Sequence, residues 1–233
     1  MAMDLSQFHC LTFDCYGTLI DWESGILGAL RPILAAHGRN LSDGGILELY
    51  SVIEAQLEAG PYLSYREILD AVVMKLAARL VFSPTAEEVH SLANSLPDWP
   101  PFPDTVPALR RLASRYRLAI ISNTDDDLFA GTARHLEVRF DPIVTAQQAR
   151  SYKPSENNFR LALERIGLPK EQVLHVAQSL YHDIAPAKDL GLATVWINRR
   201  AGKPGSGATP PASAAPDLML PDLASLAALA AGR

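Results

Sequence analysis

The chain has 233 residues, 48% of them hydrophobic and 20% charged, which is enough to bury one full core and a small second module. Its formal net charge of −5 provides no basic surface of the kind that binds nucleic acid or an anionic membrane. No apolar stretch has membrane-spanning length, and the first residues lack a signal-peptide pattern. We therefore expect a cytoplasmic protein that binds neither nucleic acid nor membranes.

The first apolar run, residues 10–13, predicts a buried strand that ends in a carboxylate and a turn, in the order D-C-Y-G-T from Asp14 to Thr18. Ligands of an open α/β sheet bind outside the carboxyl ends of the strands, so we expect Asp14 at the mouth of a pocket. The two cysteines, Cys10 and Cys15, lie on or beside this strand, where a disulfide between them is implausible. Because no basic residue lies near Cys15 in the sequence, we interpret it as a small buried side chain rather than a nucleophile.

The segment from residue 24 to 98 is predicted to be entirely helical, because apolar residues recur in it with helical spacing and no stretch alternates as a strand would. The helical periods cover residues 22–37, 46–59 and 65–81, and the segment 85–96 also has no strand pattern. Prolines then crowd into residues 96–104, which predicts a stiff extended hinge and a domain boundary. We expect residues 24–98 to form a helical cap on a core domain made of residues 1–23 and 99–233.

Strands and helices alternate after this hinge, which is typical of a mostly parallel sheet built from right-handed crossovers. The fold class is therefore α/β, with a Rossmann-like sheet and the helical cap inserted after its first strand. Residues 202–216 are rich in Gly, Pro, Ser and Ala and predict a surface loop. The predicted strands are 118–123, 142–145, 173–178, 194–198 and 218–220, with helices near 105–114, 156–166 and 185–190.

Polar residues follow four of the predicted strands, so their side chains are expected to meet at one edge of the sheet. The order is an Asp with a Thr four residues later, a Ser-Asn pair, a Lys before a Pro, and an acidic residue after the fourth strand. This order resembles the haloacid dehalogenase superfamily over nearly the whole chain, cap included. The residues that carry the resemblance are Asp14, Thr18, Ser122, Asn123, Lys153 and Asp183.

Within that superfamily, the residue two positions after the nucleophile separates two chemistries. Phosphatases place an Asp there as general acid, whereas this chain has Tyr16, which with an ordinary pKa near 10 is a poor acid at neutral pH. Phosphatases also hold Mg²⁺ with several carboxylates, and Gln178 stands where the first of those in the fourth motif is expected. The resemblance is therefore to the type II (S)-2-haloacid dehalogenases, and it implies an enzyme without a metal or other cofactor.

That resemblance implies a role for each motif residue. Asp14 attacks the 2-carbon of a short carboxylic acid, displaces its substituent with inversion, and forms an ester that water hydrolyses. Lys153 keeps Asp14 ionised, and Asp183 fixes Lys153 and assists the attacking water. Thr18 and Ser122 orient Asp14 or donate hydrogen bonds to the substrate carboxylate. The substrate-binding residues are Tyr16, Asn123, Gln178 and His182.

The departures from the pattern concern the leaving group. Family members carry an arginine on the cap that helps bind the halide, and Ser51 stands at that position, with Arg66 and Arg39 as the candidates to replace it. Three further family positions also differ, and here they are Phe159, Gln178 and Leu180. An alternative is therefore that the same nucleophile opens the C–N bond of azetidine-2-carboxylate. The leaving amine would then take a proton from His182 or Tyr181.

Two other functions remain alternatives: a Mg²⁺-dependent phosphatase of the same fold, and a non-catalytic protein that binds a small molecule. The acidic run Asp125 to Asp127 resembles a metal cluster, but acidic residues favour a helix N-terminus, and we interpret it as a cap. Monomer and homodimer both stay open. The aromatic residues Tyr50, Tyr62, Tyr65, Trp22 and Trp196 are expected mainly in the core.

Overall fold

The computed structural model describes residues 3–232 and contains a six-stranded sheet in which every pair of neighbouring strands is parallel. In the strand order, β3-β2-β1-β4-β5-β6, the first strand lies inside the sheet. The chain adds β2 and β3 on one side of β1 and then β4, β5 and β6 on the other. The predicted α/β fold is confirmed. The strands are β1 (Cys10–Phe13), β2 (Arg117–Ser122), β3 (Ile143–Thr145), β4 (Val173–Ala177), β5 (Ala193–Ile197) and β6 (Leu218–Leu220).

The central strand β1 is buried along its whole length, as its continuous apolar run requires. Its last residue, Phe13, lies opposite Ile120 of β2 and Val176 of β4. The carboxyl ends of the three strands are therefore level, and the residues that follow them lie side by side. This edge of the sheet is the topological switch point, where parallel α/β proteins bind their ligands.

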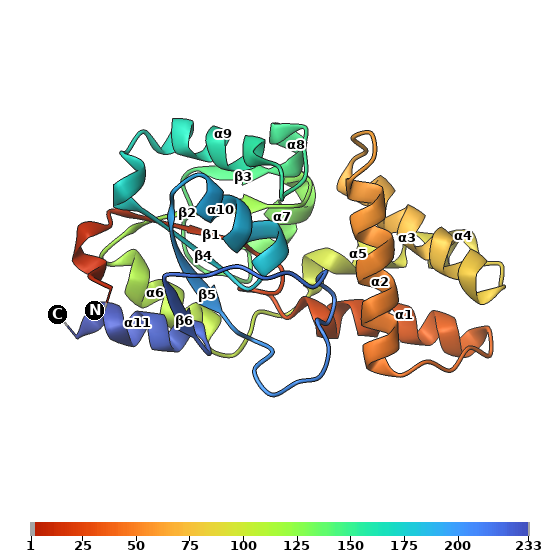
Figure 1. Cartoon of the computed structure of the whole chain (residues 1–233). Coiled ribbons are helices and arrows are strands. Elements are labelled where there is room, and N and C mark those ends of the chain that lie inside the picture. The colour runs from red at the N-terminus through yellow and green to blue at the C-terminus, as the bar shows by residue number, and fades with distance from the viewer. Residues whose placement is uncertain (1–2, 233) are drawn as a thin grey trace.

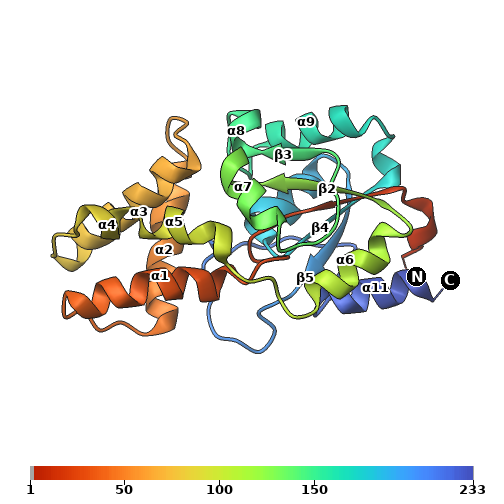
Figure 2. The same ribbon diagram turned by 180° about the vertical axis from the view of Figure 1, so that it is seen from behind.

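Helices cover both faces of the sheet (Figure 1). One face carries α8 (Ala146–Ala149), α9 (Glu156–Ile166) and α10 (Ala185–Asp189), and the other carries α6 (Thr105–Ala113) and α11 (Leu223–Ala231), as Figure 2 shows from behind. Helix α7 (Asp126–Ala133) follows β2. The sequence analysis had not included α11, which buries Leu223, Leu226 and Ala230 and packs against α6.

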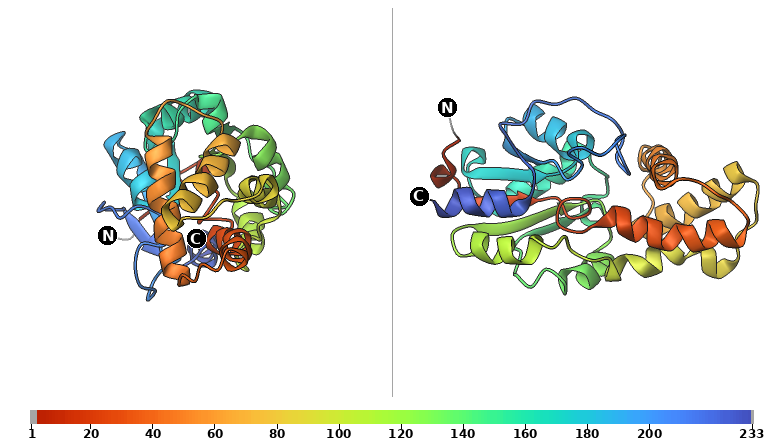
Figure 3. Two further views of the ribbon diagram at one scale, coloured as in Figure 1. Left: turned by 90° about the vertical axis from the view of Figure 1, so that its right-hand side faces the viewer. Right: turned by 90° about the horizontal axis from the view of Figure 1, so that it is seen from below.

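The cap consists of five helices inserted between β1 and α6, and it stands beyond the carboxyl edge of the sheet (Figure 3). The last helical segment is broken at His90, and Pro97 sits inside a 3₁₀ turn, Leu96–Asp98. The chain therefore becomes extended only at Trp99, three residues after the start of the predicted hinge. The cap helices are α1 (Trp22–Ala36), α2 (Asp43–Glu58), α3 (Tyr65–Leu80), α4 (Ala86–Val89) and α5 (Ser91–Ser95).

The acidic run after β2 joins the core to the cap. The carboxylate of Asp125 accepts hydrogen bonds from the backbone N–H groups of Tyr65 and Arg66, each at 3.0 Å. Helix termini leave such N–H groups without partners, so Asp125 caps α3 from the other domain. The acidic run lies at the start of α7 as predicted, with Asp125 at the N-cap position, although the Asp125 carboxylate makes no hydrogen bond to α7.

Short helical turns complete the chain: 3₁₀ turns at Leu5–Gln7 and Lys170–Gln172 and a π-helical turn at Leu180–Ile184. Within residues 3–232, no helix has both the length and the apolar character needed to cross a bilayer. Both cysteines are buried and unpaired, as the sequence predicted, and burial raises the pKa of Cys15 well above its ordinary value. A thiol of that kind is a poor nucleophile.

Candidate active site

A small cavity, with a volume of about 30 Å³, lies between the carboxyl edge of the sheet and the cap. Eight of the nine predicted site residues line it, and the ninth, Thr18, lies behind Asp14 and is hydrogen-bonded to it. The core side of the wall consists of Asp14, Tyr16, Ser122, Asn123, Lys153, Gln178, Ser179, His182, Asp183 and Thr209. The remaining wall is Trp22, at the start of α1, and the cap residues Glu54, Glu58 and Tyr65.

Asp14 follows β1 directly, and both of its carboxylate oxygens are held in place. Lys153 Nζ donates to Oδ1 at 2.9 Å, and Thr18 Oγ1 donates to Oδ2 at 2.6 Å. Thr18 in turn accepts from the backbone N–H of Gln178 at 2.9 Å, which ties the turn after β1 to the end of β4. Burial raises the pKa of Asp14, and the Lys153 ammonium opposes that rise. The attraction of Lys153 acts in the predicted direction, but burial is the larger effect.

Lys153 reaches the centre of the site from the loop after α8, and its ammonium is fully engaged. Besides Asp14, it donates to Asp183 Oδ1 at 2.6 Å and to the backbone carbonyl of Ile121 at 2.8 Å. These three acceptors match the three protons of an ammonium group. Although burial acts to lower it, the two carboxylates raise the pKa of Lys153, so it is charged at neutral pH.

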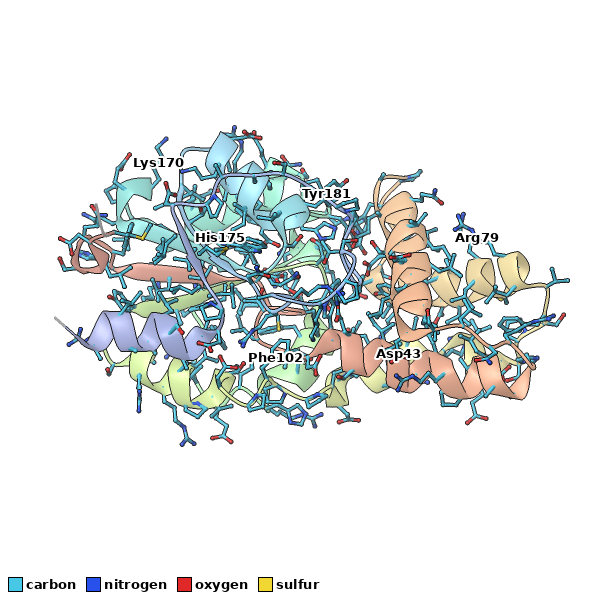
Figure 4. The ribbon with its side chains drawn as sticks, turned by 60° about the horizontal axis from the view of Figure 1, so that its bottom comes forward. Asp43, Arg79, Phe102, Lys170, His175 and Tyr181 are labelled. Atoms are coloured by element: carbon cyan, nitrogen blue, oxygen red, sulfur yellow. The ribbon has the colours of Figure 1, made fainter. Side chains whose placement is uncertain are left out.

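His175 and Thr12, which the sequence analysis did not single out, support Asp183 from inside the core. His175 Nε2 lies 3.1 Å from Asp183 Oδ1, and His175 Nδ1 lies 2.9 Å from the hydroxyl of Thr12. Because a carboxylate only accepts, we assign the imidazole proton to Nε2. Thr12 and His175 are register partners on β1 and β4, and Figure 4 shows His175 inside the core. The sequence did contain a signal for this contact, because each of two apolar strands carries one polar residue at the equivalent position.

Several buried polar atoms around the cavity lack a partner. Ser122 Oγ, His182 Nε2 and Asp183 Oδ2 make no hydrogen bond within the described residues, although all three residues line the cavity. Buried polar groups are normally satisfied, so orphaned atoms of this kind face a missing ligand or water. Although burial acts to raise it, the Lys153 ammonium and His175 hold the pKa of Asp183 below its ordinary value. Asp183 is therefore ionised, and its free oxygen can accept a hydrogen bond.

Asn123 lines the cavity and also holds the loop that carries Lys153. Its Oδ1 accepts from the backbone N–H of Lys153 at 2.7 Å, and its Nδ2 donates to the carbonyl of Lys153 at 3.1 Å. The amide thus fixes the loop that carries the lysine. Its remaining contact is with Glu58 on the cap, at 3.3 Å to each carboxylate oxygen. Asn123 has no amide proton left for a substrate carboxylate.

Tyr16 presents its ring, not its hydroxyl, to the site. The hydroxyl lies 2.9 Å from Thr132 Oγ1 on α7, and burial raises the tyrosine pKa well above its ordinary value. The following residue, Gly17, has a φ of +90°, and a Cβ there would lie 2.8 Å from the Trp22 indole nitrogen and 3.1 Å from Gln178 Oε1. Only glycine therefore permits this turn.

The cap contributes two glutamates that the sequence analysis did not single out. Glu54 Oε1 accepts hydrogen bonds from the hydroxyls of Tyr50 and Tyr65, each at 2.6 Å, and burial raises the pKa of Glu54 to about 7. Burial, with the neighbouring Glu54, also raises the pKa of Glu58 well above its usual range. The signal was two acidic residues four apart on a helix whose other buried positions are mainly apolar.

The two predicted proton donors for an amine lie in different places. His182 lines the cavity, and burial lowers its pKa to about 4, so its imidazole is neutral at pH 7. Tyr181 lines a separate cavity on the other side of Glu58, and Figure 4 shows it at the junction of core and cap. His182 is therefore not an imidazolium acid at neutral pH, and Tyr181 lies outside the site.

Neither candidate arginine replaces the family's cap arginine. Arg66 forms an exposed ion pair with Asp127 at 2.7 Å, and Arg39 donates to the backbone carbonyl of Val81 on the far part of the cap. Lys153 is the one cationic side chain among the described residues that line the cavity. The run Asp125 to Asp127 also forms no metal site, since no group of three or more His, Cys, Asp or Glu residues within 3–232 is arranged to hold an ion.

The long loop after β5 reaches the cavity as well. The loop was predicted to lie on the surface, but Ala208 and Thr209 are buried, and Thr209 lines the site. Arg200 holds this loop against the cap through Glu23 at 2.6 Å (Figure 1). Of the aromatic residues expected in the core, Tyr62 and Trp196 are only partly buried. Trp196 donates its indole N–H to the carbonyl of Gln178 at 2.8 Å.

A buried carboxylate after the first strand, a lysine shared with a second carboxylate, and a helical cap over the sheet edge are typical of a capped α/β hydrolase. A family model described as haloacid dehalogenase-like hydrolase matches residues 8–191 of the chain. The chain therefore belongs to the haloacid dehalogenase-like hydrolases, as the motif order predicted.

Individual relatives point to the same family. The chain is 27% identical over 193 residues to an (S)-2-haloacid dehalogenase of Pseudomonas fluorescens, covering 82% of this chain and 84% of that protein. It is 25% identical over 198 residues to haloacetate dehalogenase H-2 of Moraxella sp. strain B, covering 84% and 88%. Its fold is similar to that of an L-2-haloacid dehalogenase from Xanthobacter autotrophicus with chloropropionic acid covalently bound. That comparison has a TM-score of 0.77 and 21% identity, and it covers 97% of this chain and 99% of the other.

Proposed function

We propose that the protein hydrolyses a short 2-substituted carboxylic acid, with Asp14 as the nucleophile that displaces the substituent from the 2-carbon. The observation that carries this proposal is the environment of Asp14. Asp14 is only 7% exposed, and its carboxylate lines the cavity and is held by Lys153 and Thr18, without any acid beside it at position 16. The relatives named above are dehalogenases of such acids, which supports the same substrate class here.

In the first step, a carboxylate oxygen of Asp14 forms a bond to C2 while the bond from C2 to the substituent breaks, and the substituent leaves with the bonding electrons. Attack from the side opposite the leaving group inverts C2. The rigid hold of Lys153 and Thr18 orients the nucleophile, which is the main protein contribution to such a reaction. Ser122 Oγ, buried and without a partner, is placed to donate to the substrate carboxylate.

In the second step, water attacks the carbonyl carbon of the Asp14 ester and releases a 2-hydroxy acid. Asp183 Oδ2, which lacks a partner, is placed to accept a proton from that water. His175 and Lys153 keep Asp183 ionised and fixed for this role. The water oxygen ends in the carboxylate of Asp14, and an original Asp14 oxygen ends in the product.

A phosphatase with Mg²⁺ fits these residues poorly. Mg²⁺ prefers several oxygen ligands in octahedral order, whereas Oδ1 of Asp14 and Oδ1 of Asp183 are both engaged by Lys153. Tyr16 and Gln178 supply no carboxylate in their place. We therefore propose a reaction that proceeds without a metal or other cofactor.

The test is intact-protein mass spectrometry during turnover of (S)-2-chloropropionate and, separately, azetidine-2-carboxylate, both in the presence of a chelator. We expect a transient adduct on the peptide that contains Asp14, and incorporation of ¹⁸O into Asp14 when turnover occurs in labelled water. Asp14→Asn should form neither. Release of phosphate from generic esters only with added Mg²⁺, with no adduct from either acid, would instead establish the phosphatase.

A further inference from the structure

Acidic groups outnumber cationic groups around the cavity. Four carboxyl groups line it, those of Asp14, Asp183, Glu54 and Glu58, against the single ammonium of Lys153. That ammonium already donates all three of its protons within the core. A substrate that is a carboxylate adds one more negative charge. The cavity therefore favours a substrate that brings a positive charge of its own.

The two glutamates lie where the leaving group must depart. Displacement at C2 needs the leaving group on the side of the carbon opposite Asp14, because the bond forms and breaks in line. Asp14 stands at the end of β1 in the core, so the opposite wall is the cap. That wall consists of Glu54, Glu58, Tyr65 and Trp22.

The glutamates are positioned as acceptors. Both donors to Glu54, the hydroxyls of Tyr50 and Tyr65, reach the same oxygen, Oε1, and no hydrogen bond among residues 3–232 reaches Oε2. Glu58 is held from the core by Asn123, and His182 Nε2, buried and without a hydrogen-bond partner, lies 3.7 Å from Glu58 Oε2. An unpartnered polar atom beside the pair indicates that a ligand completes this part of the site.

Without a bound cation, the two neighbouring glutamates destabilise the folded state. Acidic residues four apart on one helix face repel each other, and both side chains are almost completely removed from solvent. Burial accordingly raises the pKa of both groups. A bound cation between them removes the repulsion and restores the charged forms.

We propose that Glu54 and Glu58 form a cation subsite that selects substrates whose leaving group on C2 is a protonated nitrogen, that is, 2-ammonio carboxylates. This inference rests on the proposed function, since it names the leaving group of the same displacement. A halide or a phosphoryl group, both negatively charged on departure, meets two carboxyl groups and no arginine on this wall.

The reaction balances without an external acid. Asp14 forms a C–O bond to C2, the C2–N bond breaks, and the ammonium nitrogen keeps the electron pair and becomes a neutral amine. Water then cleaves the ester, giving the 2-hydroxyl group, the Asp14 carboxylate and one proton, which the amine takes. For azetidine-2-carboxylate the product is 4-amino-2-hydroxybutanoate, formed with one water.

The test measures binding apart from turnover. Asp14→Asn protein is titrated calorimetrically with azetidine-2-carboxylate and with cyclobutanecarboxylate, which has the same ring and carboxylate but no nitrogen. We expect about 10- to 100-fold tighter binding of the ammonium ligand, the range of one or two charge-assisted hydrogen bonds. Adding Glu54→Gln or Glu58→Gln should reduce that preference by about 10-fold. Glu48→Gln, an exposed glutamate on the same helix, should leave it unchanged. Thermal melting of each variant shows whether it is folded.

The outcomes separate this inference from the proposed function. Equal binding of the two ligands, no detectable binding of either, or a preference that survives both glutamine substitutions overturns the cation subsite. If (S)-2-chloropropionate nevertheless forms the Asp14 ester, the proposed function stands with a halide as leaving group. A glutamate-dependent preference without any Asp14 ester from either acid keeps the subsite and overturns the proposed chemistry.

Discussion

At the scale of single residues, the centre of the site is one buried charge network. Lys153 joins Asp14 and Asp183, His175 supports Asp183, and Thr18 completes the hold on the nucleophile. In such a network every donor has an acceptor, so the removal of one member leaves another charge uncompensated. This property leads to two predictions.

Asp14→Asn is expected to reduce turnover by on the order of 10⁴- to 10⁶-fold, because an amide cannot attack C2, and loss of a covalent nucleophile has effects of this size. The variant retains an acceptor for Lys153 and should fold. The rate is measured by release of the leaving group and the fold by circular dichroism. A folded variant that keeps more than about one hundredth of the activity would contradict the assignment of Asp14.

Lys153→Met is expected to destabilise the protein by about 3–5 kcal/mol at pH 7, since it leaves two buried carboxylates without their counter-ion. Without the ammonium, the pKa values of Asp14 and Asp183 rise in the folded state. Their neutral forms then protect the fold at low pH, and stability is lost as the pH rises through the raised values. Urea denaturation should therefore show a smaller deficit at pH 5 than at pH 7.

The matched control is Lys188→Met, since Lys188 pairs with Asp217 while about a third of its side chain is exposed. Its loss should cost less than about 1 kcal/mol at either pH. An equal effect of the two substitutions would argue against a buried network around Lys153.

At the scale of the element, helix α2 carries the cap's part of the site. The helix buries Ile46, Leu47, Tyr50 and Ile53 as its core-facing stripe, and Glu54 continues that stripe into the cavity. A carboxyl group in this position must change its charge with pH inside the folded protein. The free energy of unfolding should therefore change with pH as Glu54 ionises.

Glu54→Gln is expected to shift the pH dependence of stability. The folded pKa of Glu54, about 7, lies above its ordinary value of 4.5, so the native state binds a proton that the unfolded chain has released. Stability from this group is present below about pH 4.5 and is lost as the pH rises to about 7, by about 3 kcal/mol in all. The variant should therefore gain about 2–3 kcal/mol relative to the natural protein between pH 5 and pH 8. Glu48→Gln melts recorded at both pH values serve as control, and parallel curves for all three proteins would contradict the prediction.

At the scale of the whole molecule, the cap and core meet across the cavity, and their junction is built from hydrogen bonds as well as apolar contacts. Asp125 caps α3 from the core, Tyr152 donates from the core to the carbonyl of Leu63 at 2.8 Å, and Arg200 reaches Glu23. These contacts come from separate loops of the core. The cap can therefore be loosened at one contact while the sheet stays intact.

Asp125→Ala is expected to lower the free energy of unfolding by about 0.5–2 kcal/mol, the usual effect of losing a helix cap. The amides of Tyr65 and Arg66 lose their acceptor, so their hydrogen exchange should accelerate more than that of β1. Asp127→Ala removes only the exposed ion pair with Arg66 and should change stability by less than about 1 kcal/mol. Equal exchange at the start of α3 in both variants would contradict the role of Asp125.

The sequence by itself determined the sheet, the cap and the family, because these depend on local patterns: apolar runs, helical periods, and polar residues at strand ends. Asp14, Thr18, Lys153 and Asp183 were predicted from those patterns, and parallel strands bring such residues to one edge. The hydrogen bonds from Asn123 to the backbone of Lys153 were not predicted, because residue spacing does not reveal such a contact.

Only the tertiary structure decided which cap residues face Asp14. Glu54 and Glu58 are ordinary helix-forming residues in the sequence, and their burial depends on how α2 lies across the sheet edge. Arg66 and Arg39 likewise seemed equivalent to other arginines until the cap was placed, and both lie outside the cavity. The charge on the cap side of the cavity depends on contacts between segments far apart in the chain, whereas the position of Asp14 depends on a single strand and its turn.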